Sequence, residues 1–130
     1  MTSHVHMIIG SSGSKLEDIM RDMKRHTSTM LRSIIQNNPI ESRKEWMLWM
    51  MERAGAKNSN NEKFQLWQQD NHPVILFNHK ILHQKLDYIH NNPVETGFVE
   101  KPEDYLYSSA RDYYDLPGLL DILLVDPLVV

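Results

Sequence analysis

The sequence LDYIHNNPV, which runs from Leu86 to Val94, joins a helical segment to a proline. Apolar residues at helical spacing before it predict a helix from Asn78 to Asn91. Tyr88 and Asn92 are four residues apart, so their side chains stack on one side of that helix, off the centre of its buried face. Pro93 predicts the end of the helix, because a proline disfavours the α conformation in the residue before it.

Tyr88 has two interpretations. A tyrosine at the edge of a buried face commonly packs its ring and leaves its hydroxyl in solvent, and Asn92 commonly ends a helix. Alternatively, Tyr88 is a nucleophile and the amide of Asn92 is a ligand one turn away. A phenol titrates near pH ~10 and attacks poorly at neutral pH. The second interpretation therefore needs a metal that polarises a phosphate.

Two histidines near the start of the chain are candidate metal ligands. The segment HVHMIIG (His4–Gly10) alternates polar and apolar residues and predicts a strand. His4 and His6 then share one face, about 7 Å apart, which allows both imidazoles to bind one ion. The alternative is two polar residues on the solvent side of an edge strand. Apolar residues face the other side: Val5, Met7 and Ile9.

The remaining pattern predicts two further helices and one further strand. The helices run from Lys15 to Gln36 and from Ser42 to Arg53, and the strand from Phe64 to Gln68. Three tryptophans are either core residues or platforms on which bases could stack, and the core interpretation is the commoner one. They are Trp46, Trp49 and Trp67.

Composition favours one globular domain. A chain of 130 residues with 41% hydrophobic and 24% charged residues is ordinary for such a domain. The absence of cysteine excludes disulfides and thiolate zinc sites, and it fits a reducing cytoplasm. No apolar run approaches the ~20 residues that span a bilayer, so we expect no membrane partner.

The charge distribution gives only weak support for nucleic-acid binding. The net charge is −3, with ten Lys/Arg and seven Asp/Glu in residues 1–63, and four and ten in residues 64–130. The basic residues of the first predicted helix either contact phosphates or form a solvated face. They are Lys15, Arg21, Lys24, Arg25 and Arg32.

Three segments resemble one family. MTSHVHMII resembles the HUH motif of single-tyrosine transposases. LDYIHNNPVETGFVEKPEDYLYSSARDY resembles the Tyr-Ile-x-x-Asn-Pro-Val block and the following Asp-Tyr-x-Tyr-Ser-Ser-Ala of the REP-associated tyrosine transposases. FQLWQQDNHPVILF resembles the Trp-Gln strand before the tyrosine helix of that family. The three segments occur in the family's order, from Met1 to about Asp115.

The resemblance implies an α/β (α+β) ferredoxin-like domain over residues 1–115, with an antiparallel sheet, helices on one face and a C-terminal tail at 116–130. Such transposases are strand transferases that cleave single-stranded DNA next to hairpins. By position, Tyr88 would form a 5′-phosphotyrosine and release a 3′-hydroxyl. His4, His6 and Asn92 would hold a divalent metal, Mg²⁺ or Mn²⁺. Imidazole ligands make Mn²⁺ the more favourable of the two.

Other tyrosines and histidines are rivals for these roles, although none combines a helix with an amide one turn on. The rival nucleophiles are Tyr105, Tyr107, Tyr113 and Tyr114, and the rival ligands are His72, His79, His83 and His90.

One departure from the family concerns its first elements. In the family a strand, a helix and another strand precede the HUH strand, whereas this sequence begins at that strand. We therefore expect a sheet without its first strands, with exposed backbone groups that favour pairing with a partner, a homodimer or impaired activity. The alternatives are a remnant that binds hairpin DNA without cleaving it, and an unrelated small metal-binding α/β protein.

Overall fold

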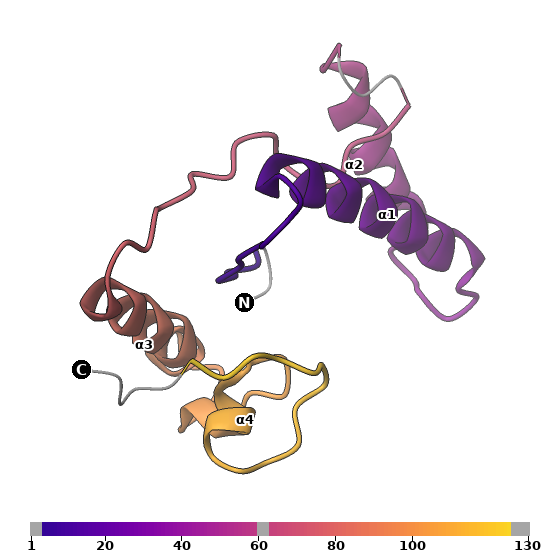
Figure 1. The fold of residues 1–130 in the computed structure, drawn as a ribbon. Coiled ribbons are helices and arrows are strands. Elements are labelled where there is room, and N and C mark those ends of the chain that lie inside the picture. The colour runs from indigo at the N-terminus through magenta and orange to yellow at the C-terminus, as the bar shows by residue number, and fades with distance from the viewer. Residues whose placement is uncertain (1–3, 60–62, 126–130) are drawn as a thin grey trace. The chain divides into compact units, whose positions relative to one another are not determined.

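The computed structural model describes residues 4–59 and 63–125, and over these ranges it is helical (Figure 1). The chain divides into two compact units. Gly10–Pro73 form the first, here called the α1–α2 unit, and Met1–Ile9 with Val74–Val130 form the second, the α3–α4 unit. The elements are α1 (Leu16–Asn37), α2 (Lys44–Ala56), α3 (His79–Glu95), the 3₁₀ helix η1 (Pro102–Asp104) and α4 (Ala110–Tyr113).

The expected ferredoxin-like α/β fold is wrong, because the described residues contain no strand and therefore no antiparallel sheet. The segment from His4 to Gly10 is irregular and carries no ladder of backbone hydrogen bonds. Strands are stable only where another strand pairs their backbone groups, and no described segment does so here. The predicted apolar face of this segment is accordingly exposed rather than buried: Val5, Met7 and Ile9.

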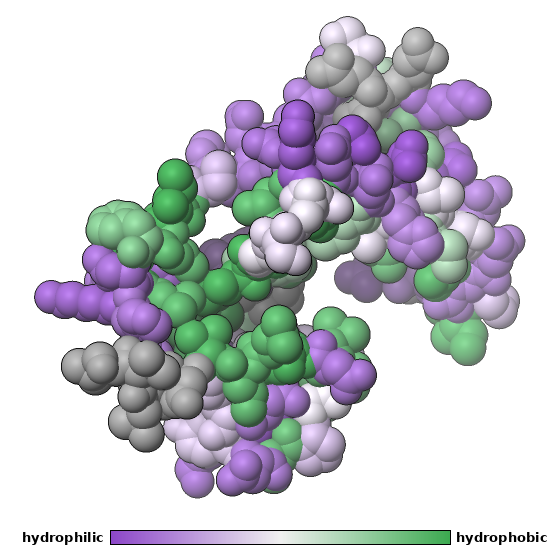
Figure 2. Space-filling model, in the orientation of Figure 1, coloured by the Kyte–Doolittle hydropathy of each residue, from purple (hydrophilic) through white to green (hydrophobic). Residues whose placement is uncertain are grey.

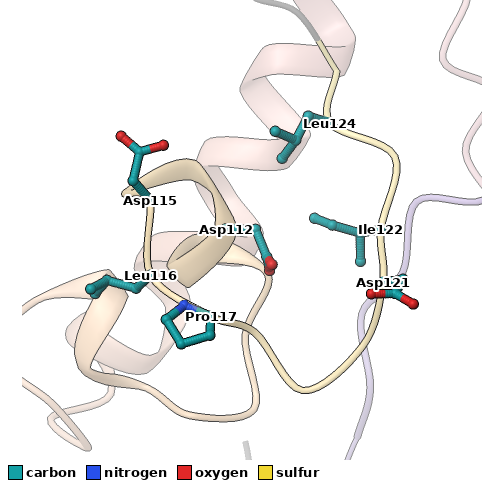
Figure 3. Close-up of a pocket in the computed structure, with 7 residues that line it drawn as sticks. All are labelled: Asp112, Asp115, Leu116, Pro117, Asp121, Ile122 and Leu124. Atoms are coloured by element: carbon teal, nitrogen blue, oxygen red, sulfur yellow. The ribbon is translucent and has the colours of Figure 1, made fainter.

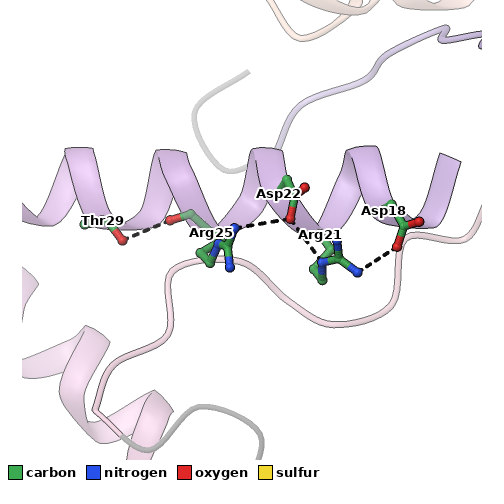
Figure 4. Close-up of polar contacts among 5 residues, drawn as sticks. All are labelled: Asp18, Arg21, Asp22, Arg25 and Thr29. Carbon is green, nitrogen blue, oxygen red and sulfur yellow. Dashed lines mark hydrogen bonds and ion pairs between the residues drawn. The ribbon is translucent and has the colours of Figure 1, made fainter. Parts of the chain in front are cut away.

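The helix predicted at Lys15–Gln36 is confirmed, with α1 one residue later at each end. One side of α1 carries ion pairs between residues a turn or less apart, as Figure 4 shows. Arg21 Nη1 lies 2.6 Å from Asp18 Oδ1, and Arg21 Nε lies 3.0 Å from Asp22 Oδ1. Arg25 Nη2 lies 3.5 Å from the same oxygen of Asp22. These charges are exposed, so this side of α1 faces solvent.

The other side of α1 packs against α2 (Figure 1). Arg32 links the two helices through Nη2, 3.2 Å from Glu52 Oε1. The segment predicted as the strand Phe64–Gln68 crosses the pair without forming one. Its Gln65 N–H donates to the Met51 carbonyl at 2.9 Å. This segment therefore pairs its backbone with a helix rather than with a strand.

The tryptophans do not form the core that the sequence favoured. Trp46 and Trp49 of α2 are 58% and 50% exposed, and the guanidinium of Arg53 lies 5.1 Å from the Trp49 ring. Trp67 is partly buried, and its Nε1–H donates to Thr27 Oγ1 at 2.8 Å. Only the third tryptophan therefore contributes to packing within the α1–α2 unit.

The helix α3 continues through Pro93, so the predicted end at Asn91 is wrong. Proline removes one backbone hydrogen bond of a helix. The loss is limited here because Pro93 lies in the last turn, whose carbonyls find other donors. The N–H of Phe98 donates to the Pro93 carbonyl and that of Gly97 to the Val94 carbonyl, each at 2.9 Å. With Gly97 at φ +76°, these bonds form a Schellman motif.

Arg111 of α4 fixes the loops of the α3–α4 unit. Its Nε donates to the Pro117 carbonyl at 2.9 Å and its Nη1 to the Glu103 carbonyl at 3.1 Å. The hydroxyl of Tyr113 accepts a hydrogen bond from the N–H of Val125 at 2.9 Å. Irregular segments are thus held by side chains of one short helix.

Hydrophobic burial is slight in both units. Met51 and Ala110 are the buried hydrophobic side chains of the described residues. Figure 2 shows hydrophilic side chains over much of α1, and hydrophobic side chains on the visible surface of the α3–α4 unit. No helix within the described ranges is long and apolar enough to cross a membrane.

Candidate functional site

The structure brings the two candidate ligands and the candidate nucleophile together. The ring centroids of His4 and His6 are 4.9 Å apart, and the rings meet edge to face. The ring centroid of His6 is 5.5 Å from that of Tyr88, with an interplanar angle of 82°. Edge-to-face packing of this kind is favourable between aromatic rings. Two segments that are distant in the sequence therefore meet at this point.

Both histidines and Asn92 line one pocket of about 180 Å³ in the α3–α4 unit. This volume holds several waters at ~30 Å³ each, or a phosphate group. Three segments form the walls. His4, Val5 and His6 come from the N-terminal segment, Ile89 and Asn92 from α3, and Tyr105, Tyr107, Ser108 and Ser109 from the loop before α4.

The helix α3 sets the positions of Tyr88 and Asn92. Its first turn is capped by Asn78, whose side chain accepts from the N–H of Ile81 at 2.8 Å. Its last turn remains helical through Pro93, which keeps Asn92 one turn beyond Tyr88. Asn92 is only 5% exposed, whereas Tyr88 is 49% exposed. The amide thus lies in the wall of the pocket while the phenol remains accessible to a large substrate.

Nε2 of His6 is buried, and the described residues offer it no hydrogen-bond partner. Burial, together with the neighbouring charge of His4, lowers the pKa of His6 below its ordinary value of 6.5. The imidazole is therefore neutral at neutral pH, which is the form that binds metals. A buried nitrogen without a partner is costly unless a ligand satisfies it.

These residues fit a divalent metal. His4 and His6 would supply imidazole nitrogens, the unsatisfied Nε2 of His6 among them. Asn92 would supply an amide oxygen from the same wall. The described residues contain no group of three or more His, Cys, Asp and Glu side chains placed to hold an ion. An amide as third ligand agrees with that finding, because the donor set here contains only two histidines.

The sequence gave no role to the loop that closes the pocket. Tyr105 and Tyr107 entered only as rival nucleophiles, and Ser108 and Ser109 only as part of the YLYSSA block. The structure places all four in the pocket wall. Among the rival ligands, His90 does not line the pocket but bonds to Ser109, with Nε2 3.0 Å from Oγ. The only advance signal was the resemblance of this block to the transposase motif.

A second pocket of about 510 Å³ lies in the C-terminal part of the same unit (Figure 3). Its walls carry the carboxylates of Asp112, Asp115 and Asp121 beside apolar side chains. None of the predicted site residues lines it. It is therefore separate from the candidate site.

Most of the basic residues considered as phosphate contacts already have partners within the chain. Arg21 and Arg25 pair with aspartates of α1, as Figure 4 shows. Lys24 Nζ donates to the Gln68 carbonyl at 2.6 Å, and Arg32 pairs with Glu52. Exposed ion pairs are weak and exchange readily. These residues do not constitute a ready-made basic face.

Comparison with known proteins finds no matching family model, no matching curated protein and no matching solved structure.

Proposed function

We propose that the protein is a metal-dependent DNA strand transferase of the REP-associated tyrosine transposase type, with Tyr88 as nucleophile. One observation carries the proposal. His4 and His6 share a pocket with Asn92, and the ring of Tyr88 packs on that of His6. The substrate is single-stranded DNA beside a hairpin, and a protein that acts on cellular DNA in this way belongs in the cytoplasm.

In the proposed reaction the phenolic oxygen of Tyr88 attacks a phosphorus of the DNA backbone. The bond from phosphorus to the 3′ oxygen breaks, the 3′ oxygen takes up a proton, and the phenol loses one. The products are a 5′-phosphotyrosine and a free 3′-hydroxyl. Attack by another 3′-hydroxyl on the phosphotyrosine reverses the chemistry and joins the strands, so no external energy source is needed.

His4, His6 and Asn92 would hold the Mg²⁺ or Mn²⁺ ion in this mechanism. The bound ion would offset the charge that develops on the phosphate oxygens. The protein's own residues have separate tasks. The packing of His6 against Tyr88 orients the phenol toward the pocket, and the exposure of Tyr88 leaves room for a strand of DNA. The two imidazoles favour Mn²⁺ over Mg²⁺.

The test is formation of a covalent adduct with a labelled single-stranded hairpin oligonucleotide in the presence of Mn²⁺. We expect an adduct that survives denaturation, that chelation of the metal prevents, and that Tyr88→Phe abolishes, because phenylalanine keeps the ring contact but has no nucleophile. Tyr114→Phe is the matched control, since Tyr114 is equally exposed in the same unit but lies outside the pocket. An adduct that persists in Tyr88→Phe would contradict the assignment.

A second candidate function is DNA binding without cleavage. The exposure of Trp46 and Trp49 on α2 favours it, because exposed aromatic rings stack on the bases of single strands. Retention of the hairpin oligonucleotide in a gel, without any adduct, and loss of that retention in Trp49→Ala would support this function over strand transfer.

A further inference from the structure

Ser109 lies in the wall of the candidate site and is held there by a residue outside the pocket. Its Oγ is 3.0 Å from Nε2 of His90, and Ser109 lines the pocket that also contains His6 and Asn92. His90 and Asn92 are two residues apart on α3, on different sides of the helix. The same stretch of α3 therefore contributes one wall residue directly and fixes another through a hydrogen bond.

His90 has little freedom to move. It is 8% exposed, and its ring centroid lies 5.1 Å from that of Tyr113. The hydroxyl of Tyr113 in turn accepts from the N–H of Val125 at 2.9 Å. A buried imidazole packed in this way provides a fixed point for the hydroxyl to which it bonds.

The backbone around Ser109 is also fixed. The N–H of Ser108 donates to the Tyr105 carbonyl at 3.1 Å, and the N–H of Ala110 donates to Ser108 Oγ at 3.1 Å. The Ser109 carbonyl accepts from the N–H of Asp112 at 3.1 Å. These three bonds form a turn that holds the serine at the pocket wall.

The hydroxyl retains capacity for a ligand. A serine hydroxyl offers one donor and two acceptor positions, and the bond to His90 uses one of them. No Asp or Glu lines the pocket among the described residues, so nothing there repels an anion. The polar groups that face Ser109 in the pocket are imidazoles, an amide and hydroxyls. This set suits a phosphate oxygen better than a cation.

We propose that Ser109 is a phosphate-binding residue of this pocket and that His90 is a positioning residue that orients its hydroxyl. The inference rests on the proposed function for the identity of the substrate, a phosphodiester of DNA. The binding of phosphate itself is independent of strand transfer, which allows the two proposals to fail separately.

The experiment measures two quantities in the full chain. The first is the affinity for inorganic phosphate, followed by NMR shifts of the pocket residues. The second is the single-turnover rate of adduct formation with the hairpin oligonucleotide and Mn²⁺, as a function of DNA concentration. We expect Ser109→Ala to weaken phosphate binding and slow the reaction by about tenfold or more, because a hydrogen bond to a charged group is lost. Ser33→Ala is the matched control, an exposed hydrogen-bonded serine of the other unit.

His90 is tested by two substitutions. His90→Leu keeps the apolar packing and removes the bond to Ser109, so we expect a lower maximal rate with little change in the DNA concentration at half-maximal rate. His90→Gln restores a bonding group, and we expect it to recover most of the rate. A merely structural role of His90 predicts loss of stability in both variants without that recovery.

The outcomes separate the proposals. If the wild-type protein forms no adduct yet binds phosphate, and Ser109→Ala loses that binding, the strand-transfer proposal fails while Ser109 keeps its role. If Ser109→Ala matches Ser33→Ala in both measurements, the role of Ser109 is overturned. If Ser109→Ala does not fold, Ser109→Cys replaces it, because the thiol has nearly the same shape and is a weaker donor; unchanged phosphate affinity in that variant overturns the role equally.

Discussion

The two units of the protein are organised by contacts of different range. In the α1–α2 unit, the ion pairs of Arg21 and Arg25 join residues of the same helix, three or fewer positions apart. In the α3–α4 unit, the bonds that shape the site join residues far apart in the sequence. His90 and Ser109 are 19 positions apart, and His6 contacts Tyr88 across most of the chain.

This difference separates helix formation from site formation. The helices of the α1–α2 unit follow from local patterns, and long-range contacts are concentrated in one segment that crosses them, as in the bond from Trp67 to Thr27. The candidate site of the α3–α4 unit exists only where three segments converge. Changes in that unit should therefore propagate further than changes on the surface of α1.

The largest expected effect is that of Arg111→Met on stability. The substitution removes the guanidinium bonds to the carbonyls of Pro117 and Glu103 while it keeps much of the apolar stem. Hydrogen bonds to charged groups contribute about 1.5–3 kcal/mol each when partly buried, so we expect a loss of about 3 kcal/mol for the pair. Amide hydrogen exchange, read separately for each unit, measures it.

Arg25→Met in the α1–α2 unit is the control, because it removes a single exposed ion pair at 3.5 Å. We expect faster exchange after Arg111→Met in the loops and in α4, and none in α1. Equal effects of the two substitutions would remove the distinction between the units.

The next effect concerns the one close approach of backbones in the α1–α2 unit. A Cβ added at Gly55 would lie 2.6 Å from the Cα and N atoms of Phe64. Overpacking of this kind costs about 1–3 kcal/mol, which exceeds the gain of about 0.5–1 kcal/mol that alanine has over glycine in a helix. Gly55→Ala should therefore lower the urea midpoint of unfolding.

Gly10→Ala serves as the comparison for Gly55→Ala, because nothing lies within 4 Å of the added Cβ. We expect its urea midpoint to remain at the wild-type value. A midpoint that Gly55→Ala leaves unchanged would mean that the crossing segment moves away from α2 at little cost.

A smaller effect is expected from pH, and it belongs to the α3–α4 unit. Burial lowers the pKa of His90 below 6.5, although the charge of Asp87 acts in the opposite direction. The unfolded chain then binds a proton that the folded chain does not. The contribution of His90 to stability is complete above pH 6.5 and is lost as the pH falls from there through the lowered pKa.

Thermal unfolding measured across this range should show a midpoint that falls with pH, and His90→Gln should reduce the slope. The lowered pKa of His6 acts in the same direction, so some slope should remain in that variant. A midpoint that rises as the solution becomes more acidic would contradict the burial of both rings.

The smallest effect is expected on the surface of α1. Arg21→Gln removes the ion pairs to Asp18 and Asp22, which Figure 4 shows on an exposed side of the helix. Exposed pairs contribute little to stability, so we expect no measurable change in the thermal midpoint. A clear destabilisation would show that this side of α1 has a role beyond solvation.

Some features of the fold and site followed from the sequence alone. The apolar spacing of residues 15–36 predicted α1 within one residue, because a helix satisfies its backbone by bonds within its own segment. The spacing of Tyr88 and Asn92 on one helix was fixed for the same reason. The resemblance to the transposase motif also marked His4 and His6 as residues to examine together.

Only the tertiary structure decided the rest. Alternation in His4–Gly10 predicted a strand, but a strand depends on a partner elsewhere, and no described segment pairs with it. Pro93 predicted a helix end, yet bonds from Gly97 and Phe98 allow the last turn to persist. The contact of His6 with Tyr88 and the bond of His90 to Ser109 join distant segments. Local periodicity carries no information about such contacts, because it records only what each segment does with its own neighbours.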